Sequence, residues 1–397
     1  MFYEDNNTAK LLDMEDVIVK NVESNGDEVH IYIELPRKMQ ICPRCGRETD
    51  RIHDYREQKI KDIPFGKTTY LHLRKRRYSC VHCRKHFAEK NTLVPRYYRL
   101  TRRCIASIIQ QLKELVCATE VARKHNVSVT SVFRYFKPIC YSCTELPEVL
   151  SIDEFKGDTG GEKYQTILTD AKNRSVQDIL PNRTEQNLKK YFLGFENRND
   201  VKYFVCDMNP HFRSVAKECF PNAKIIADRY HVTRQVVWAM EAVRKAEQKK
   251  YSAKFRKYFK HSRVLLNKEF LSDEEKVNLS VMFENAPRLA EAYRLKNLFL
   301  DVMHTKNNPE TAAKKLSDWF MAAEAAAFRA ESPLSEFKSC ITAYHNWSTE
   351  ILNALSVPYS NGFTEGYNNK TKVLKRVCFG LRNFERFRSR ILHCSCY

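Results

Sequence analysis

Two short cysteine hooks constrain the fold of this chain more than any other feature. The first hook is Cys42-Pro43-Arg44-Cys45, followed by Gly46, and the second is Cys80-Val81-His82-Cys83, with 34 residues between Cys45 and Cys80. A two-residue gap lets both sulfurs of a hook meet one metal ion, and two hooks supply the four thiolates of a tetrahedral zinc site. The intervening residues are typical of a β-hairpin around Gly66-Lys67. We therefore predict a structural zinc site whose ligands are Cys42, Cys45, Cys80 and Cys83.

Other readings of the hooks stay open at this point. A redox dithiol or plain buried thiols would use the same residues. A histidine could replace a missing ligand, and the nearby candidates are His53, His82 and His86. The chain has 14 cysteines but begins with the acidic stretch MFYEDNNTAKLLDMED, which lacks the layout of a signal peptide. We therefore expect thiols and metal ligands, not a disulfide framework.

The charge of the chain is segregated by sign. Lys and Arg number 68 against 48 Asp and Glu, a formal net charge of +20. Residues 36–143 hold 25 basic and 8 acidic residues, an excess of 17, whereas residues 1–35 hold 2 basic and 9 acidic. Residues 359–397 are basic again, 8 to 2. This segregation favours nucleic acid as partner over an evenly solvated surface. The basic residues predicted to face phosphates beside the second hook are Arg74, Lys75, Arg76 and Arg77.

A helix-turn-helix pattern follows the second hook. Residues 101–116 place Ile and Leu at i, i+3, i+4 and i+7 with Thr101 as N-cap, which predicts an amphipathic helix. Residues 118–136 then put the small Ala122 where two helices would cross and Asn126 at a turn position that needs positive φ. A generic helical hairpin is the alternative, and the basic surroundings favour DNA binding. The residues that the second helix would offer to DNA are Ser128, Thr130, Ser131 and Arg134.

After Pro147 the sequence alternates between strands and helices. Residues 148–155, 163–171 and 175–182 predict an antiparallel meander, followed by a helix, a strand, a helix and a fifth strand that ends at residue 228. This order, βββαβαβ, is that of a ribonuclease-H-like core, in which carboxylates stand at the ends of adjacent central strands. Such carboxylates hold the divalent ions that stabilise phosphodiester cleavage. Asp153, within the first strand, is the predicted bridging ligand; an ordinary strand-end aspartate is the alternative.

The last part of the chain carries a second acidic motif. Residues 232 to 357 are helical and charged without a catalytic pattern, which predicts an all-α insertion. The following motif, SNGFTEGYNNKTKVLKR, places Glu365, Asn368, Asn369 and Lys372 on one helical face. An acid, two amides and a lysine suit a metal ligand followed by phosphate contacts. A glutamate that merely favours a helix N-terminus is the alternative.

Taken together, these motifs resemble the ISL-three family of bacterial insertion-sequence transposases. The resemblance rests on both hooks, the helix pair, LSIDEF, VCDMNP, IADRYHV and the closing motif, and runs from about Cys42 to Leu392. It implies a zinc finger and helix-turn-helix that bind terminal inverted repeats, and a DDE catalytic domain that uses Mg²⁺ or Mn²⁺. Asp153 would be the first acid and Glu365 the last, and the predicted DNA contacts of the closing motif are Lys372, Lys375 and Arg376. Cys378 departs from the pattern, where we expect a hydroxyl residue.

The second acid has two candidates. Asp207 closes the fourth strand, which lies beside the first strand in such folds, whereas Asp228 follows the fifth strand and is linked to His231 by the motif DRYH. We favour Asp207 because an edge strand lies farther from Asp153. Asp228 and His231 are kept as secondary site residues.

The sequence therefore predicts a multidomain α+β protein. The expected segments are an N-terminal β segment (1–35), a zinc finger (36–94), a helix-turn-helix (95–143), a ribonuclease-H-like core (147–231 and 359–397) and an all-α insertion (232–358). We expect a homo-oligomer on double-stranded DNA that catalyses Mg²⁺-dependent strand cleavage and transfer, located in the cytoplasm with the nucleoid and without a membrane partner. A catalytically silent DNA-binding regulator and a nuclease that cuts without joining are the alternatives.

Overall fold

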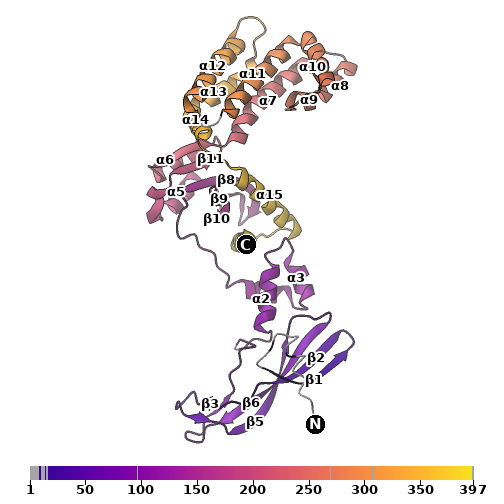
Figure 1. Ribbon diagram of the computed structural model, residues 1–397, viewed down its shortest axis with the longest axis vertical. Helices are drawn as coiled ribbons and strands as arrows, with labels where there is room; N and C mark the ends of the chain where they lie inside the picture. Colours follow the sequence, from indigo (N-terminus) through magenta and orange to yellow (C-terminus); the bar gives the residue numbers. More distant parts are fainter. Residues whose placement is uncertain are drawn as a thin grey trace. The chain divides into compact units, whose positions relative to one another are not determined.

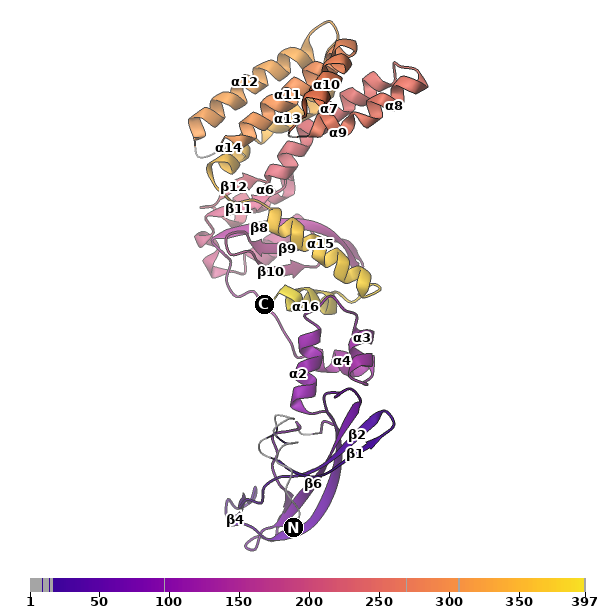
Figure 2. The same cartoon turned by 45° about the vertical axis from the view of Figure 1, so that its right-hand side comes forward.

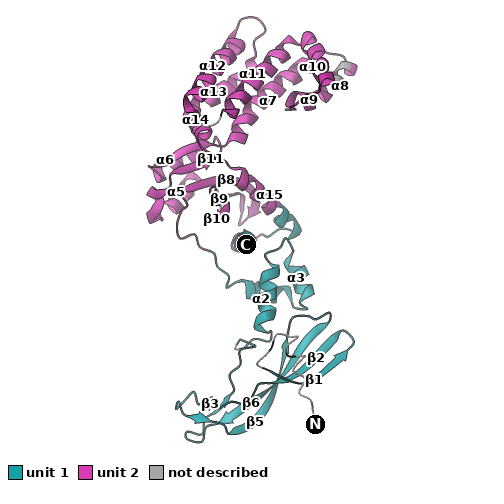
Figure 3. Cartoon of the chain, viewed as in Figure 1, with its two compact units in different colours: residues 1–141, 373–381, 389–397 teal, residues 142–372, 382–388 magenta. Residues whose placement is uncertain are grey.

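The chain forms two compact units that interleave along the sequence. The computed structural model describes residues 9, 14, 17–95, 97–268, 270–305 and 308–395. Unit 1 comprises residues 1–141, 373–381 and 389–397, and unit 2 comprises residues 142–372 and 382–388 (Figure 3). Much of the predicted N-terminal segment before residue 17, and Cys396, lie outside the described residues.

Unit 1 is built on a five-stranded sheet in the order β1-β2-β6-β5, with β7 paired to β6 (Figure 1). Its strands are β1 (Ile18–Asn25), β2 (Glu28–Glu34), β5 (Ile52–Lys61), β6 (Thr68–Ser79) and β7 (His86–Ala88), and a separate two-stranded sheet joins β3 (Gln40–Ile41) to β4 (Glu48–Thr49). The antiparallel pairing of β5 with β6 confirms the predicted hairpin. Alternate residues of β2 and β6, such as Ile33 and Leu71, are buried in its core.

Three short helices of unit 1 follow this sheet: α2 (Arg102–Gln111), α3 (Ala118–Lys124) and α4 (Val129–Phe136). Thr101 caps α2 as predicted, because its side chain accepts a hydrogen bond from the Cys104 N–H at 3.1 Å. The helix ends at Gln111, earlier than the apolar pattern predicts. After Gln111 the chain forms turns, and the backbone carbonyl groups of Glu114 and Val116 there accept hydrogen bonds from the Arg390 guanidinium.

Unit 2 contains a second five-stranded sheet in the order β10-β9-β8-β11-β12. Its strands are β8 (Val149–Thr159), β9 (Glu162–Asp170), β10 (Ser175–Leu180), β11 (Tyr203–Cys206) and β12 (Lys224–Ala227), with α5 (Glu185–Phe192), a 3₁₀ turn (Glu196–Asp200) and α6 (Pro210–Cys219) between them. The first three strands are antiparallel, which confirms the predicted meander. Strand β11 runs parallel to both β8 and β12, so it lies between them.

A helical segment separates the two parts of this sheet-containing unit in sequence. Its helices are α7 (Arg229–Gln248), α8 (Ala253–His261), α9 (Arg263–Asn267), α10 (Asp273–Asn285), α11 (Pro287–His304), α12 (Pro309–Phe328), α13 (Lys338–Asn346) and α14 (Ser348–Ser356), with a 3₁₀ turn at Ser335–Phe337. Helix α7 runs from the edge of the sheet into this bundle (Figure 2). Stacked rings of Phe299 and Tyr344, with centroids 4.4 Å apart, form part of the bundle core. Among the described helices, none is both long and apolar enough to cross a membrane.

The last two helices return to both units. Helix α15 (Gly362–Val377) lies beside β8 in unit 2, where the Thr364 hydroxyl is 3.1 Å from that of Ser151 and 2.7 Å from that of Thr169. Helix α16 (Phe384–Ser395) begins in unit 2, where Arg388 donates to Asp178 at 2.6 Å, and ends in unit 1, where His393 Nε2 is 2.7 Å from the Ile109 carbonyl. Both units thus need residues from the end of the chain.

Candidate functional site

The four predicted metal-binding cysteines gather at one point of unit 1. Their sulfur atoms all lie within 4.8 Å of one another, and the Cys42–Cys83 and Cys45–Cys80 pairs are each 3.5 Å apart. Tetrahedral zinc with bonds of about 2.3 Å would place its sulfur ligands about 3.8 Å apart, so the cluster fits that ion. Within the part of the chain that the structure describes, this cluster consists of the four cysteines and does not include His53, His82 or His86.

The two hooks have the same backbone conformation. In the first, the Gly46 N–H donates to the Cys42 carbonyl at 3.0 Å, and in the second the Arg84 N–H donates to the Cys80 carbonyl at 2.9 Å. Gly46 and Arg84 both have positive φ, at 70° and 58°. Burial opposes ionisation of the Cys42 thiol, but the N–H groups of Arg44 and Cys45 lower its pKa to about 6. The first hook therefore favours the thiolate form of Cys42, the form that binds a metal ion. At Cys83, by contrast, a backbone hydrogen bond lowers the pKa, but burial and the neighbouring cysteine side chains outweigh it and raise that pKa to about 11.

A second cluster lies in unit 2, where β8, β11, α7 and α15 meet. It surrounds a cavity of about 460 Å³. The residues that line the cavity are Asp153, Glu154, Asp207, Tyr230, His231, Arg234, Glu365, Asn368, Asn369 and Lys372. The structure thus brings the three predicted acids, Asp153, Asp207 and Glu365, to one place although 212 residues separate the first from the last.

Asp153 is the most buried acid of the cavity, with 7% of its surface exposed. One carboxylate oxygen accepts a hydrogen bond from the Asn368 side chain at 2.7 Å, and the other accepts the Glu154 N–H at 2.7 Å. Burial, and then the negative charge of Asp207, raise the pKa of Asp153 to about 7. Its neighbour Glu154 is directed to Arg183, with which it forms an ion pair.

Asp207, His231 and Glu365 form a chain of contacts across the cavity. His231 Nδ1 is 2.9 Å from Asp207 Oδ2, and its Nε2 is 3.5 Å from Glu365 Oε1. Burial lowers the pKa of His231, but the hydrogen bond and charge of Asp207 outweigh it and raise that pKa above the usual value. The other oxygen of Asp207, Oδ1, is buried without a hydrogen-bond partner. A buried carboxylate oxygen without a partner is costly unless a cation binds it.

Asp228 lies close by but has a different role in the fold. It is the N-cap of α7, and one oxygen accepts the His231 N–H at 3.3 Å. The other oxygen accepts the Asn361 N–H at 3.0 Å, just before α15. Asp228 is only 2% exposed, and burial raises its pKa. Although Asp207, Asp228 and His231 are close enough to hold one ion together, both oxygens of Asp228 already bind the backbone.

Sequence reasoning missed two residues of the cavity, Tyr230 and the cationic Arg234. Its guanidinium is 3.0 Å from His231 Nδ1 and lies over the rings of Tyr230 and Trp238, 5.5 and 4.6 Å from their centroids. The signal was present in the sequence, because Arg234 follows His231 by three residues on the same helix face. Arg234, like Lys372, places a cation at the wall of this cavity, which is also lined by carboxylates.

The basic residues beside the second hook are largely paired within unit 1. Arg76 is 6% exposed, and its guanidinium contacts Glu34, Glu89 and the Leu35 carbonyl. This burial argues against the predicted role of Arg76 in DNA binding, because its charge is already neutralised. Other residues of this run also have partners: Arg74 binds Glu34, Lys75 binds Gln58 and Arg77 binds Asp54.

The other predicted DNA contacts lie on two helices. Thr130 and Arg134 of α4 are exposed, and Ser128 is its N-cap, whose hydroxyl accepts the Ser131 N–H at 3.2 Å. On α15, Lys372 and Arg376 are exposed and Lys375 is half-buried. The Lys372 ammonium donates to Asn369 at 3.4 Å, so it lies at the rim of the acidic cavity.

Comparison with known proteins matches the sequence of this chain to a family. A family model described as transposase, of the ISL3 type, matches residues 150–391. The chain belongs to the ISL3 family of transposases. A second model, described as the zinc-finger of transposase IS204/IS1001/IS1096/IS1165, matches residues 38–83 and includes all four cysteines of the cluster. The cluster of this transposase is thus a structural zinc site.

Relatives of this ISL3 transposase include proteins of two insertion sequences. The transposase for insertion sequence element IS1001 of Bordetella parapertussis is 27% identical over 379 residues, which cover 92% of this chain and 91% of the relative. The transposase for insertion sequence element IS1557 of Mycobacterium tuberculosis is 24% identical over 251 residues, 56% of this chain and 54% of the relative. A stretch of 56 residues, 14% of the chain, is 39% identical to part of an ATP-dependent protease of Lactococcus lactis.

Proposed function

We propose that this transposase cuts and joins DNA at a divalent-metal site formed by Asp153, Asp207 and Glu365. The observation that carries the proposal is the pairing of Asp153 with Asp207. Asp153 lies on β8 and Asp207 directly follows the neighbouring strand β11, and their mutual repulsion contributes to the raised pKa of Asp153. A fold gains nothing from such repulsion unless a cation offsets it. The buried, unpartnered Oδ1 of Asp207 supports the same conclusion.

Asp207, and not Asp228, is the proposed second acid. Strand β11 lies next to β8, whereas β12 is the edge strand, as expected for a ribonuclease-H-like core. The five-strand order, with β11 parallel to β8 and the first three strands antiparallel, supports this fold. Asp228 instead links the start of α7 to Asn361, which precedes α15, because its two oxygens accept the backbone N–H groups of His231 and Asn361. Its role in the proposal is to hold α7 and α15 in place.

The residues present suit Mg²⁺, which prefers carboxylate oxygens and keeps several waters. Bound divalent ions would stabilise negative charge on the attacking and leaving oxygens of the phosphodiester. Asn368 holds Asp153 in place by donating to one of its oxygens at 2.7 Å. His231 fixes the direction of the Asp207 carboxylate by a contact of 2.9 Å. Lys372, exposed at the rim, is placed to contact a DNA phosphate.

DNA recognition is assigned to unit 1. The helices α3 and α4, with positive φ at Asn126 in the turn between them, support a helix-turn-helix whose second helix offers Ser128, Thr130 and Arg134. Together with the zinc site, this unit would bind the terminal inverted repeats of the element. A homo-oligomer would then hold two DNA ends while a freed 3′-hydroxyl attacks the target.

The test is Mg²⁺-dependent cleavage of a duplex that carries the element's terminal repeat. Asp207→Asn should abolish cleavage and leave repeat binding unchanged, whereas Asp228→Asn should retain cleavage to the extent that it stays folded. Cleavage lost only in Asp228→Asn would refute the assignment of Asp207. Wild-type protein that binds the repeat but never cuts it would instead support the silent regulator, and cuts without joined products would support a plain nuclease.

A further inference from the structure

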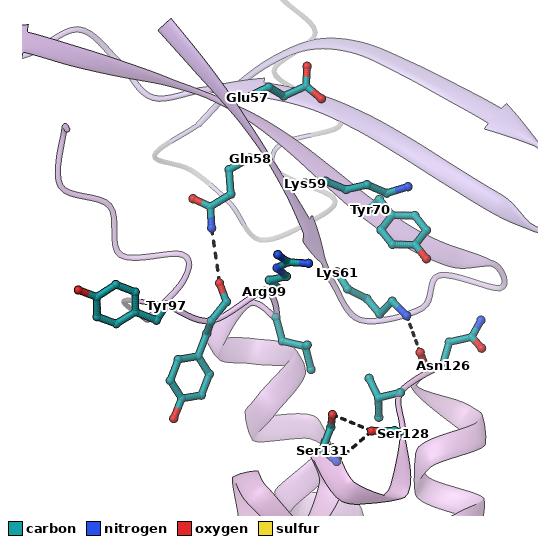
Figure 4. Close-up of a pocket in the computed structure, with 13 residues that line it drawn as sticks. Glu57, Gln58, Lys59, Lys61, Tyr70, Tyr97, Arg99, Asn126, Ser128 and Ser131 are labelled. Carbon is teal, nitrogen blue, oxygen red and sulfur yellow. Dashed lines mark hydrogen bonds between the residues drawn. The ribbon is translucent and has the colours of Figure 1, made fainter.

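Unit 1 contains a cavity of about 850 Å³ that lies between the end of β5, the segment before α2 and the beginning of α4 (Figure 4). None of the basic residues beside the second hook lines it. The side chains that give it its chemistry are Lys59, Lys61, Tyr70, Tyr97, Tyr98 and Arg99. None of these six residues is among the DNA contacts predicted from the sequence.

The cavity is positively charged. Lys59 and Lys61 are alternate residues of β5, so their side chains leave the same face of the strand. Arg99 adds a third cation and is exposed. One carboxylate, Glu57, also lines the cavity, but it is 2.6 Å from His72 Nδ1 and is thus already engaged. Three cations therefore face one paired acid.

Aromatic rings accompany these cations. The Lys59 ammonium lies 3.8 Å from the centre of the Tyr70 ring. Tyr98 packs against Tyr135 of α4 with ring centroids 5.5 Å apart, which links the cavity wall to that helix. Tyr97 is 88% exposed, a large fraction for an aromatic side chain. Cations interleaved with exposed tyrosines are typical of surfaces that bind a sugar-phosphate chain.

The walls of the cavity are fixed to each other. The Lys61 ammonium donates to the Asn126 carbonyl (Figure 4). The Asn126 side chain in turn donates to the Thr68 hydroxyl. The turn before α4 is therefore bound to the β5–β6 hairpin. A site whose walls are held in this way is preformed and loses little entropy when its ligand binds.

We propose that this cavity binds the sugar-phosphate backbone of double-stranded DNA next to the segment that α4 reads. The inference rests on the proposed DNA-binding function and adds a specific surface to it. Lys59 and Arg99 contact phosphates, and Tyr97 packs against the sugars. Lys61 mainly holds the turn. The sheet and the helices α2–α4 form one continuous DNA-binding surface in consequence.

A DNA strand fits this cavity better than a small anion. Alternate residues of a β-strand lie about 6.7 Å apart, so the cations are spread along a line and not gathered around one point. The cavity also opens beside the start of α4, whose exposed Thr130 and Arg134 continue the polar surface. An extended polyanion would meet both parts at once.

The test uses the full chain and the double variant Lys59→Gln/Arg99→Gln. The matched control, Lys254→Gln/Lys257→Gln, removes the same charge elsewhere: both lysines are exposed on α8, in the helical segment of unit 2. Binding to a terminal-repeat duplex, a scrambled duplex and the single strand is measured by fluorescence anisotropy at several salt concentrations. Circular dichroism and zinc content check that each variant is folded.

Each phosphate contact contributes about 0.9 to the slope of log affinity against log salt. Loss of two contacts should lower the slope by about 1.8 and weaken binding about 60-fold at 0.1 M salt and about 18-fold at 0.2 M. We expect equal losses on repeat and scrambled duplexes, because phosphates carry no sequence information. The control should keep the wild-type slope.

Three results would overturn the inference. The first is a double variant that binds duplex with wild-type affinity and slope. The second is a loss confined to the repeat sequence, which would indicate base contacts, and the third is a greater loss on the single strand. Failure of the proposed DNA binding by unit 1 looks different, because wild-type protein itself would then bind no duplex. That result would refute both the DNA-binding role of unit 1 and the role of this cavity.

Discussion

Substitution of Asp153, the most buried acid that lines the cavity, should make unit 2 more stable at alkaline pH. Asp153 has a pKa of about 7 in the folded protein and 3.8 as a free side chain. Each unit of difference corresponds to 1.36 kcal/mol, so ionised Asp153 destabilises the folded state by about 4 kcal/mol at pH 8. Asparagine has the same shape and no charge. It loses the hydrogen bond from the Glu154 N–H, which costs about 1 kcal/mol. We expect Asp153→Asn to be more stable than wild type by about 3 kcal/mol at pH 8.

The sign of the effect follows from proton linkage. Between pH 4 and 7 the folded chain keeps a proton on Asp153 that the unfolded chain has lost, so wild-type stability falls as pH rises through this window. The advantage of Asp153→Asn should therefore vanish near pH 4.5. Other groups titrate in both proteins, so the difference between them isolates Asp153.

Urea unfolding without added Mg²⁺ measures this difference. Tryptophan fluorescence reports on unit 2 alone, because all three tryptophans, Trp238, Trp319 and Trp347, lie in that unit. Asp170→Asn is the matched control: this acid is also buried, and one of its oxygens accepts the N–H groups of Lys172 and Asn173 at 2.8 and 3.0 Å. It should not stabilise the protein at pH 8, because both oxygens of Asp170 accept hydrogen bonds in the folded chain. The reasoning is refuted if Asp153→Asn gains no stability at pH 8.

Three further predictions concern the metal ions and the turn before α4. Mg²⁺ at 100 times its Kd should raise the unfolding free energy of wild type by about 2.7 kcal/mol, as followed by urea unfolding; a response of the same size in Asp207→Asn would exclude Asp207 as a ligand. Elemental analysis should find one zinc ion per chain, lost in Cys45→Ala together with thermal stability of unit 1, whereas Cys140→Ala, a change at an exposed thiol, should keep both. Asn126→Ala should lower the free energy of unfolding, measured by chemical denaturation, by about 2 kcal/mol, because alanine tolerates the φ of 56° poorly and loses the hydrogen bond to Thr68. Asn126→Gly loses the same hydrogen bond but tolerates this φ, so it should cost less. Equal losses of stability in the two variants would show that φ is unimportant there.

Local signals in the sequence were sufficient for much of this fold. Turn residues and apolar alternation predicted the β8–β10 meander, and the spacing of the hooks predicted the cysteine cluster that the structure contains. Thr101 as N-cap and positive φ at Asn126 were also predicted, because capping and turn geometry depend on neighbouring residues. The structure places Asp207 directly after β11, the strand next to the one that carries Asp153, as the element order predicted.

Contacts between distant residues could not be predicted in this way. Arg76 looks like its neighbours in a basic run, but its partners Glu34 and Glu89 lie 42 and 13 residues away. Buried positions of β6 also change from odd to even numbers between Leu73 and Arg76, which places this arginine inside. One of the two hydrogen bonds of Asp228 likewise comes from Asn361, which lies just before α15 and 133 residues away in the sequence. From the sequence alone, Asp207 and Asp228 therefore both remained candidates for the second acid.

The interleaving of the two units also bears on how this protein is made. Ribosomes release the chain from its N-terminus, so Asp153 and Asp207 emerge long before Glu365, and the Glu114 and Val116 carbonyls emerge long before Arg390. Neither unit is complete until the final helices have been synthesised. A chain still being synthesised would thus lack parts of both the proposed catalytic site and the proposed DNA-binding unit. Under the proposed function, neither cleavage nor repeat binding would begin before the last helices have been made.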